Sequence, residues 1–201
     1  EWEPGAVRVS AVGPDGRGRA LEARAVVVAV PLGVLAAPVD AEGAIRFEPE
    51  PEVCRVAVRR LAMGSVVRLV LRFREPVWER VRVPVSGRPQ ALARLGFLHT
   101  PGGAFQVWWT LAPVRAPVLV AWAGGPPAAR LVRRGRDAWE GTALREMAAL
   151  LGLARREVER AFVESYAHDW DSDPYARGAY SYGLVGGADA TRALARPVAG
   201  T

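Results

Sequence analysis

The spacing of apolar and polar residues predicts that the chain begins with β-structure. Residues 6–12, AVRVSAV, alternate, and the turn-forming stretch GPDGRG leads from them into ARAVVVAV, residues 23–30. This second run is apolar on both faces, which is typical of a strand buried inside a parallel or mixed sheet that is covered on both sides. We therefore expect a β-meander that closes with a buried strand, ended by Pro31 and Gly33.

The next apolar residues are spaced as in a helix, and a predicted strand with a charged residue between two valines follows. One apolar stripe in residues 51–64 predicts a helix. Residues 63–73, MGSVVRLVLRF, alternate as a half-buried strand whose apolar side carries Val67, Leu69, Leu71 and Phe73. On the opposite side Arg68 lies between Val66 and Val70, an unusual setting for a charged residue.

The second half alternates between strands and helices. Apolar segments within residues 95–100, 104–111 and 117–125 predict three strands, because glycine or proline separates them. We expect helices at residues 126–134, at 137–151 with Asp137 as N-cap, and at 155–160. Together these elements predict an α/β or α+β fold, in which a mixed β-sheet is backed by helices.

Composition narrows the function classes. The 201 residues carry a net charge of +6, which would permit a nucleic-acid partner, but all 27 basic residues are arginines scattered along the chain. A nucleic-acid footprint should be clustered, so we expect no nucleic-acid partner. A single cysteine, Cys54, and two separated histidines, His99 and His168, argue against a disulfide or a metal site.

Membrane and targeting segments are also not expected. The most apolar run, residues 25–39, is too short to span a bilayer and is interrupted by Pro31 and Pro38. No signal peptide is visible, and the chain opens without Met, which suggests a piece of a longer protein. We expect a cytoplasmic location.

Aromatic residues are the main chemical signal. The chain has no G-x-S-x-G, H-E-x-x-H, P-loop or G-x-G-x-x-G motif. Trp122 and Trp139 fit the core of a sheet protein, whereas Tyr175, Tyr180 and Tyr182 fall in the glycine-rich, aperiodic stretch 170–201. Such rings suit a planar cofactor or an amine-bearing substrate.

Three segments in this order resemble the flavin-dependent amine oxidase family, which includes monoamine, polyamine and L-amino-acid oxidases and lysine-specific histone demethylases. They are ARAVVVAVPLGVL, IRFEPEPEVCRVAVRRLAMGSVVRLVLRFREPVW and WDSDPYARGAYSYGLVGG. The resemblance implies a substrate-binding domain at residues 39–169, with edges of a Rossmann-like FAD-binding domain at 1–38 and 170–201. The family's N-terminal glycine motif and C-terminal FAGE-type segment are absent, so this chain alone should bind FAD poorly.

The resemblance also implies site residues. Arg68 stands where the family usually has a lysine directed at the flavin, and it would be catalytic together with Tyr180, one wall of the cage around the substrate amine. Trp109 and Tyr180 would contact the substrate. Ala179 stands where monoamine oxidases have a flavin-linked cysteine, so non-covalent FAD is expected. The implied cofactor-binding residues are Val30, Pro31, Trp170, Tyr175 and Ala179.

These residues lead to two hypotheses from different classes. The first is oxidative deamination of a small-molecule amine with dioxygen, giving an imine or aldehyde and hydrogen peroxide. The second is a degenerate flavoprotein domain that binds a ligand or a partner without turnover, because Arg68 replaces the usual lysine and arginine is far harder to deprotonate.

Overall fold

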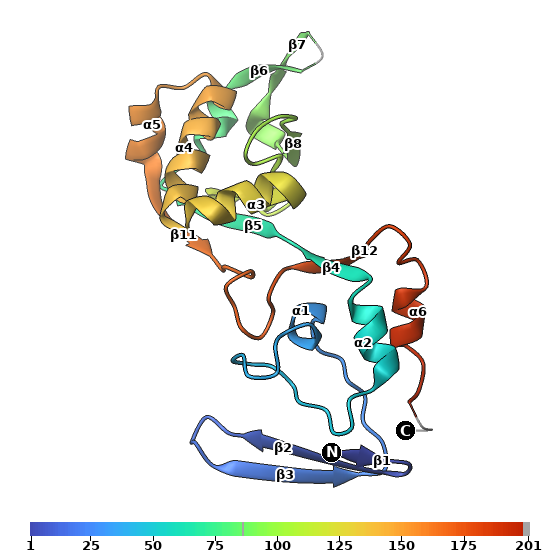
Figure 1. The fold of residues 1–201 in the computed structure, drawn as a ribbon. Coiled ribbons are helices and arrows are strands. Elements are labelled where there is room, and N and C mark those ends of the chain that lie inside the picture. The colour runs from blue at the N-terminus through green and yellow to red at the C-terminus, as the bar shows by residue number, and fades with distance from the viewer. Residues whose placement is uncertain (86, 199–201) are drawn as a thin grey trace. The chain divides into compact units, whose positions relative to one another are not determined.

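The computed structural model describes residues 1–85 and 87–198, and these residues form two compact units. Unit 1 comprises Glu1–Met63 and the described residues from Ser172 onward, and unit 2 comprises Gly64–Asp171. Figure 1 shows the elements of both units. The units are described separately below.

Unit 2 is built on a five-stranded sheet in the order β11-β5-β10-β9-β8. Each neighbouring pair in it is antiparallel. The predicted mixed sheet is therefore antiparallel here, because hairpin-type connections such as the one from β8 to β9 reverse the chain. The strands are β5 (Val66–Phe73), β8 (Phe97–His99), β9 (Val107–Thr110), β10 (Val118–Gly124) and β11 (Phe162–Ala167).

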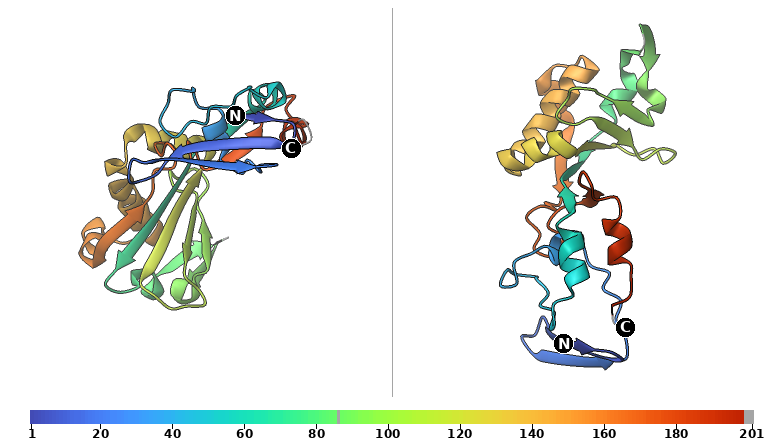
Figure 2. Two further views of the ribbon diagram at one scale, coloured as in Figure 1. Left: turned by 90° about the horizontal axis from the view of Figure 1, so that it is seen from below. Right: turned by 45° about the vertical axis from the view of Figure 1, so that its right-hand side comes forward.

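Helices cover one face of this sheet. The helices are α3 (Gly125–Arg134), α4 (Asp137–Leu151) and α5 (Arg155–Ala161), and α3 and α4 lie across β5 in Figures 1 and 2. The apolar side of β5 enters their shared core, as the sequence predicted: Val67, Leu69, Leu71 and Phe73 are at most 2% exposed. The helix predicted at residues 137–151 is confirmed, although its N-cap is Arg136 and Asp137 is its first helical residue.

Short elements complete unit 2 beyond the end of β5. The 3-10 turn η1 (Val77–Arg80) buries Val77 and Trp78, and Phe73 packs edge-on against Trp78. The hairpin β6 (Arg82–Val85) and β7 (Arg88–Ala91) follows, and η2 (Leu92–Arg94) leads into β8.

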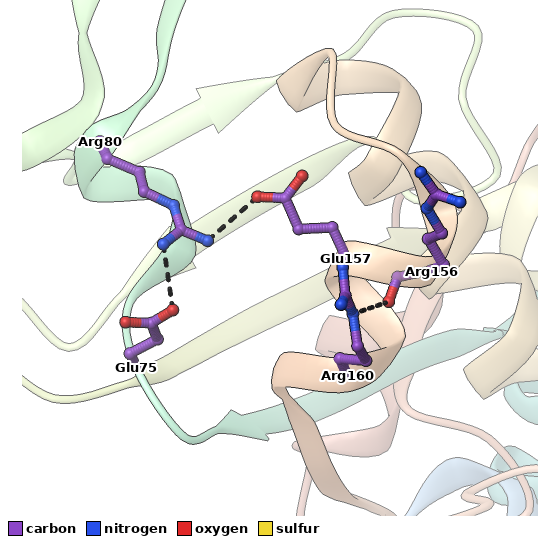
Figure 3. A network of polar contacts seen from close by, with 5 residues as sticks. All are labelled: Glu75, Arg80, Arg156, Glu157 and Arg160. Carbon is purple, nitrogen blue, oxygen red and sulfur yellow. Dashed lines mark hydrogen bonds and ion pairs between the residues drawn. The ribbon is translucent and has the colours of Figure 1, made fainter.

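Arg80 links η1 to α5 through two carboxylates. Its guanidinium lies 3.1 Å from the carboxylates of both Glu75 and Glu157 (Figure 3). Nearby in α5, the Arg160 side chain donates a hydrogen bond to the Arg156 carbonyl. All three side chains of the Arg80 network are at least one-third exposed. Solvent screening therefore weakens these ion pairs.

We expect Arg80→Met to lower the free energy of unfolding by less than about 1 kcal/mol, because exposed ion pairs contribute little. Urea denaturation of Arg80→Met, Glu157→Gln and the double variant would give the coupling between the two side chains. A loss above about 2 kcal/mol in the single variant would contradict this expectation.

Unit 1 combines a three-stranded sheet with short helices. The sheet runs β1 (Trp2–Glu3), β2 (Ala6–Val12) and β3 (Gly18–Ala23), with antiparallel pairing. A second, two-stranded sheet joins β4 (Leu61–Gly64) to β12 (Tyr180–Gly183). The helices are α1 (Leu32–Leu35), α2 (Glu52–Val58) and α6 (Ala190–Leu194).

Two predictions for unit 1 are wrong. The run at residues 23–30 is not a buried strand: residues 24–29 are exposed, and among the described residues none pairs with 24–30 in a sheet. An apolar run becomes a buried strand only where neighbouring strands supply its hydrogen bonds. The helix predicted for 51–64 ends at Val58, because Leu61–Gly64 pairs with β12 instead.

The described residues contain neither a candidate membrane-spanning helix nor a candidate metal cluster. None of their helices is both long and apolar enough to cross a bilayer. No group of three or more His, Cys, Asp and Glu side chains in residues 1–85 and 87–198 is placed to hold a metal ion.

Candidate functional site

Arg68 and several aromatic residues of unit 2 lie on the sheet face opposite α3 and α4. We call this face the open face. Strand register places its side chains in rows. One row runs His99, Val107, Trp122 and Arg68, and the next runs Phe97, Trp109, Val120, Val70 and Tyr166. A third row holds Val118, Arg72 and Glu164.

Arg68 lies beside Trp122 on this face. The two residues are direct cross-strand partners, and such partners have Cβ atoms about 5 Å apart. Arg68 is exposed, whereas Trp122 is half-buried. The prediction that Trp122 belongs to the core is therefore wrong, and the two-residue alternation of Val118, Val120 and Trp122 was the signal that could have placed it on this face.

The second arginine of the open face is paired. Arg72 Nε donates to Glu164 Oε1 at 2.6 Å, across the β5–β11 pair. A hydrogen bond from Tyr166 and this contact from Arg72 both lower the pKa of the Glu164 carboxyl. Glu164 therefore stays ionised, and it neutralises Arg72.

Aromatic rings surround the middle of the open face. Phe97 and Trp109 lie with ring centroids 6.1 Å apart, and Phe97 is 68% exposed. Trp109, predicted to contact the substrate, does lie on the same face as Arg68. The sequence reasoning missed Phe97 and Tyr166, which carry no motif and are placed only by strand register.

Trp170 follows β11 within unit 2. Its ring contacts the His168 ring edge-on, with centroids 4.4 Å apart, and Trp170 is 41% exposed. The next residue, Asp171, accepts a hydrogen bond from Ser65 Oγ at 2.6 Å. This bond ties the segment that carries Trp170 to the residue that precedes β5.

The other predicted site residues lie in unit 1. Pro31 is the N-cap of α1, directly after Val30. Tyr180 begins β12 and lies near Tyr182, with ring centroids 6.3 Å apart and both rings exposed. Tyr175 is 65% exposed, and Ala179 is also exposed.

Arg177 shapes the segment that carries Tyr175 and Ala179. It has a positive φ of 54°, a conformation in which a non-glycine residue is strained. Its guanidinium donates to the Pro174 carbonyl at 3.1 Å and to the Glu42 carbonyl at 2.6 Å. These two bonds hold the turn in a defined conformation.

Two hollows, one in each unit, are lined by none of the predicted site residues. In unit 1 a hollow of about 380 Å³ lies between α2 and α6 and includes Val53 and Val56. In unit 2 a hollow of about 280 Å³ includes Arg136, Glu140 and Ser165. The site residues predicted from the sequence therefore lie outside these two hollows.

Gly124 sets the position of the Trp122 ring. A Cβ added at Gly124 would lie 2.9 Å from Trp122 Cζ2, closer than real Cβ contacts. We expect Gly124→Ala to displace the indole and to change the near-ultraviolet circular dichroism of the protein. Gly96→Ala is the matched control, because a Cβ there meets nothing within 4 Å. Equal spectra for both variants would contradict this prediction.

Several of these side chains fit a flavin by their chemistry. Arg68 offers a cation without a carboxylate partner among the described residues, and a reduced flavin is anionic. In unit 2 Trp170 offers an exposed ring that suits a planar ligand; within unit 1 Tyr175 and Tyr180 do the same. The glycine-rich element that would hold the pyrophosphate of a dinucleotide is not in this sequence.

Comparison with curated proteins gives relatives over most of this chain. A lysine-specific histone demethylase 1 homolog 3 from Arabidopsis thaliana is 31% identical over 176 residues, covering 87% of this chain and 10% of the relative. A probable polyamine oxidase 5 from the same plant is 26% identical, covering 86% of this chain and 35% of the relative. The chain thus spans about a third or less of these relatives.

Solved structures with a similar fold and a matching family model point to the same family as these relatives. A putrescine oxidase triple mutant has a TM-score of 0.73 at 21% identity, covering 99% of this chain and 39% of the other. Wild-type putrescine oxidase bound to putrescine has a TM-score of 0.68 at 20% identity, with the same coverage. These likenesses confirm the α/β fold class. The family model described as flavin containing amine oxidoreductase matches residues 1–201. The chain therefore belongs to the flavin-containing amine oxidoreductase family.

Proposed function

We propose that this chain is part of an FAD-dependent amine oxidase and that its open face borders the substrate. The observation that carries the proposal is Arg68, a cation on a face lined with Trp109 and Trp122, in a chain of this family. When bound, a flavin would supply the redox chemistry, which is hydride acceptance from the carbon next to the amine and electron transfer to dioxygen with hydrogen peroxide as product.

The residues of this chain would orient the substrate and stabilise charge. Trp109 and Trp122 present ring surfaces that exclude water from one side of a bound amine. Arg68 would stabilise negative charge that develops in its vicinity. By the family resemblance, Tyr180 would contact the substrate amine and Tyr175 the cofactor.

Anaerobic reduction tests the proposal. The complete protein should contain flavin, and an amine should bleach its visible absorbance without oxygen; air should then restore the colour and release peroxide. Acid precipitation should release the flavin, because the methyl group of Ala179 has no nucleophilic atom for a covalent link. A protein without flavin, or a flavin that no amine reduces, would contradict the proposed function.

A further inference from the structure

A side-chain hydrogen bond closes the end of the β5–β11 pair in unit 2. The register of this pair runs as far as Ala167 opposite Leu69. Continued by four residues along each segment, the same register sets Asp171 opposite Ser65, and Asp171 Oδ2 does accept a hydrogen bond from Ser65 Oγ at 2.6 Å. The bond therefore holds together the segment that precedes β5 and the segment that follows β11.

Ser65 is the fixed side of this bond. The neighbouring β5–β10 pair extends to Gly124 opposite Val66. The Ser65 carbonyl accepts a hydrogen bond from the backbone N–H of Gly125, the first residue of α3, at 3.1 Å. Residues 168–171, by contrast, belong to no strand or helix. The Ser65 hydroxyl is thus an anchor for an irregular segment.

The Asp171 carboxyl group is poorly suited to a purely stabilising role. Its Oδ1 atom is buried and has no hydrogen-bond partner within the part of the chain that the structure describes. A buried polar atom without a partner lowers the stability of a protein, so the bond from Ser65 offsets only part of that loss. The bond does fix a conformation, and the Asp171 backbone N–H tightens the same turn by donating to Asp169 Oδ1 at 3.2 Å.

Trp170 is the residue that this segment presents. It directly precedes Asp171, its ring lies edge-on to His168 with centroids 4.4 Å apart, and 41% of it is exposed. In the continued register Trp170 stands opposite Val66, two residues from Arg68 on β5. Arg68 and Trp170 are the two residues of unit 2 that the family resemblance places at the flavin. The hydrogen bond to Asp171 therefore sets the position of one relative to the other.

We propose that Ser65 and Asp171 are positioning residues, whose hydrogen bond holds the Trp170 ring at a defined place beside the flavin. The inference rests on the proposed function, because it concerns the cofactor of the same enzyme. A ring in a fixed place confines a planar ligand, whereas a ring on a loose turn spends part of its time elsewhere. Loss of the bond should loosen this contact without removing a group that touches the flavin.

Hydrogen exchange tests the bond directly and does not depend on turnover. In the complete protein, Ser65→Ala and Asp171→Ala should each raise the exchange rate of the backbone amides of residues 168–171 by about 10-fold, the effect of losing one hydrogen bond. The double variant should match the single ones, because each removes the same bond. Ser165→Ala is the matched control: Ser165 Oγ also donates to a carboxylate, Glu140 Oε2 at 2.7 Å, and its loss should leave exchange in residues 168–171 unchanged.

The visible circular dichroism of the bound flavin tests the positioning. The isoalloxazine ring is planar, so this signal arises from the groups that are held around it. Trp170→Phe should change the signal, and Ser65→Ala should change it in the same direction. Ser65→Thr, which keeps the hydroxyl, should restore the spectrum of the unmodified protein, and Ser165→Ala should not alter it.

Two results would overturn the proposal. One is exchange in residues 168–171 that Ser65→Ala leaves unchanged or that Ser165→Ala raises equally. The other is a flavin spectrum that Trp170→Phe or Ser65→Ala leaves unchanged. In either case, flavin that an amine reduces would leave the proposed function standing. A protein without flavin, in which exchange can still be measured, would contradict the function itself.

Discussion

Trp139→Ala is expected to lower the free energy of unfolding of unit 2 by about 3–5 kcal/mol, the usual loss for truncating a buried tryptophan. Trp139 is 1% exposed and belongs to the same core as the apolar side of β5. The substitution removes most of the Trp139 side chain from the core that α4 shares with the sheet. The remaining cavity then adds to the lost burial.

Trp139 also completes the end of α3. Its Nε1 donates to the Leu131 carbonyl at 2.9 Å. Leu131 lies within the last four residues of a helix that ends at Arg134, where carbonyls have no partner inside the helix. Trp139→Phe keeps much of the volume but leaves this buried carbonyl unsatisfied, so we expect a loss of about 1–3 kcal/mol.

Urea denaturation of the unmodified protein, Trp139→Ala and Trp139→Phe would separate the contribution of packing from that of the hydrogen bond. Trp170→Ala is the control of the same residue type, because Trp170 is 41% exposed, and it should cost less than about 1 kcal/mol. If Trp139→Ala and Trp170→Ala had equal effects, the core assignment of α4 would be wrong.

Local periodicity explains what could be predicted from the sequence. The alternation of β5 and the bounds of α4 depend on residues a few positions apart, so both were recovered. Pairing over long distances is a different matter. Leu61–Gly64 is a strand because it pairs with β12, more than 100 residues later in the chain. The local sequence pattern does not predict such a distant partner.

The candidate site follows the same logic. Two valines flank Arg68 along its strand, and strand alternation predicts the face of the sheet that carries it. Its neighbours on that face, Trp122 above all, depend on the register between β5 and β10, which the sequence does not state. The run at residues 24–30 shows the reverse case, because its composition predicts burial and the described residues supply no partner strand.

Gly33→Ala is expected to destabilise unit 1 by about 1–3 kcal/mol, the usual cost of forcing an atom into a packed site. Gly33 lies in α1, where it is buried against the turn at residues 176–177. A Cβ at Gly33 would lie 2.6 Å from Arg177 Cβ and 2.7 Å from the carbonyl oxygens of Ala176 and Arg177. Two of these three atoms belong to the backbone, so no rotamer change can relieve the contact.

The turn that meets Gly33 has little freedom to move. Arg177 is held at its positive φ by hydrogen bonds to the Pro174 and Glu42 carbonyls. Displacing it would also shift Tyr175 and Ala179, so Gly33→Ala should lower the flavin content of the complete protein as well as its Tm. Gly18→Ala is the matched control, because a Cβ there meets nothing within 4 Å and its φ is not positive. Thermal denaturation and the ratio of flavin to protein absorbance would compare the two variants, and a Gly33→Ala protein as stable as Gly18→Ala would show that α1 does not pack on this turn as described.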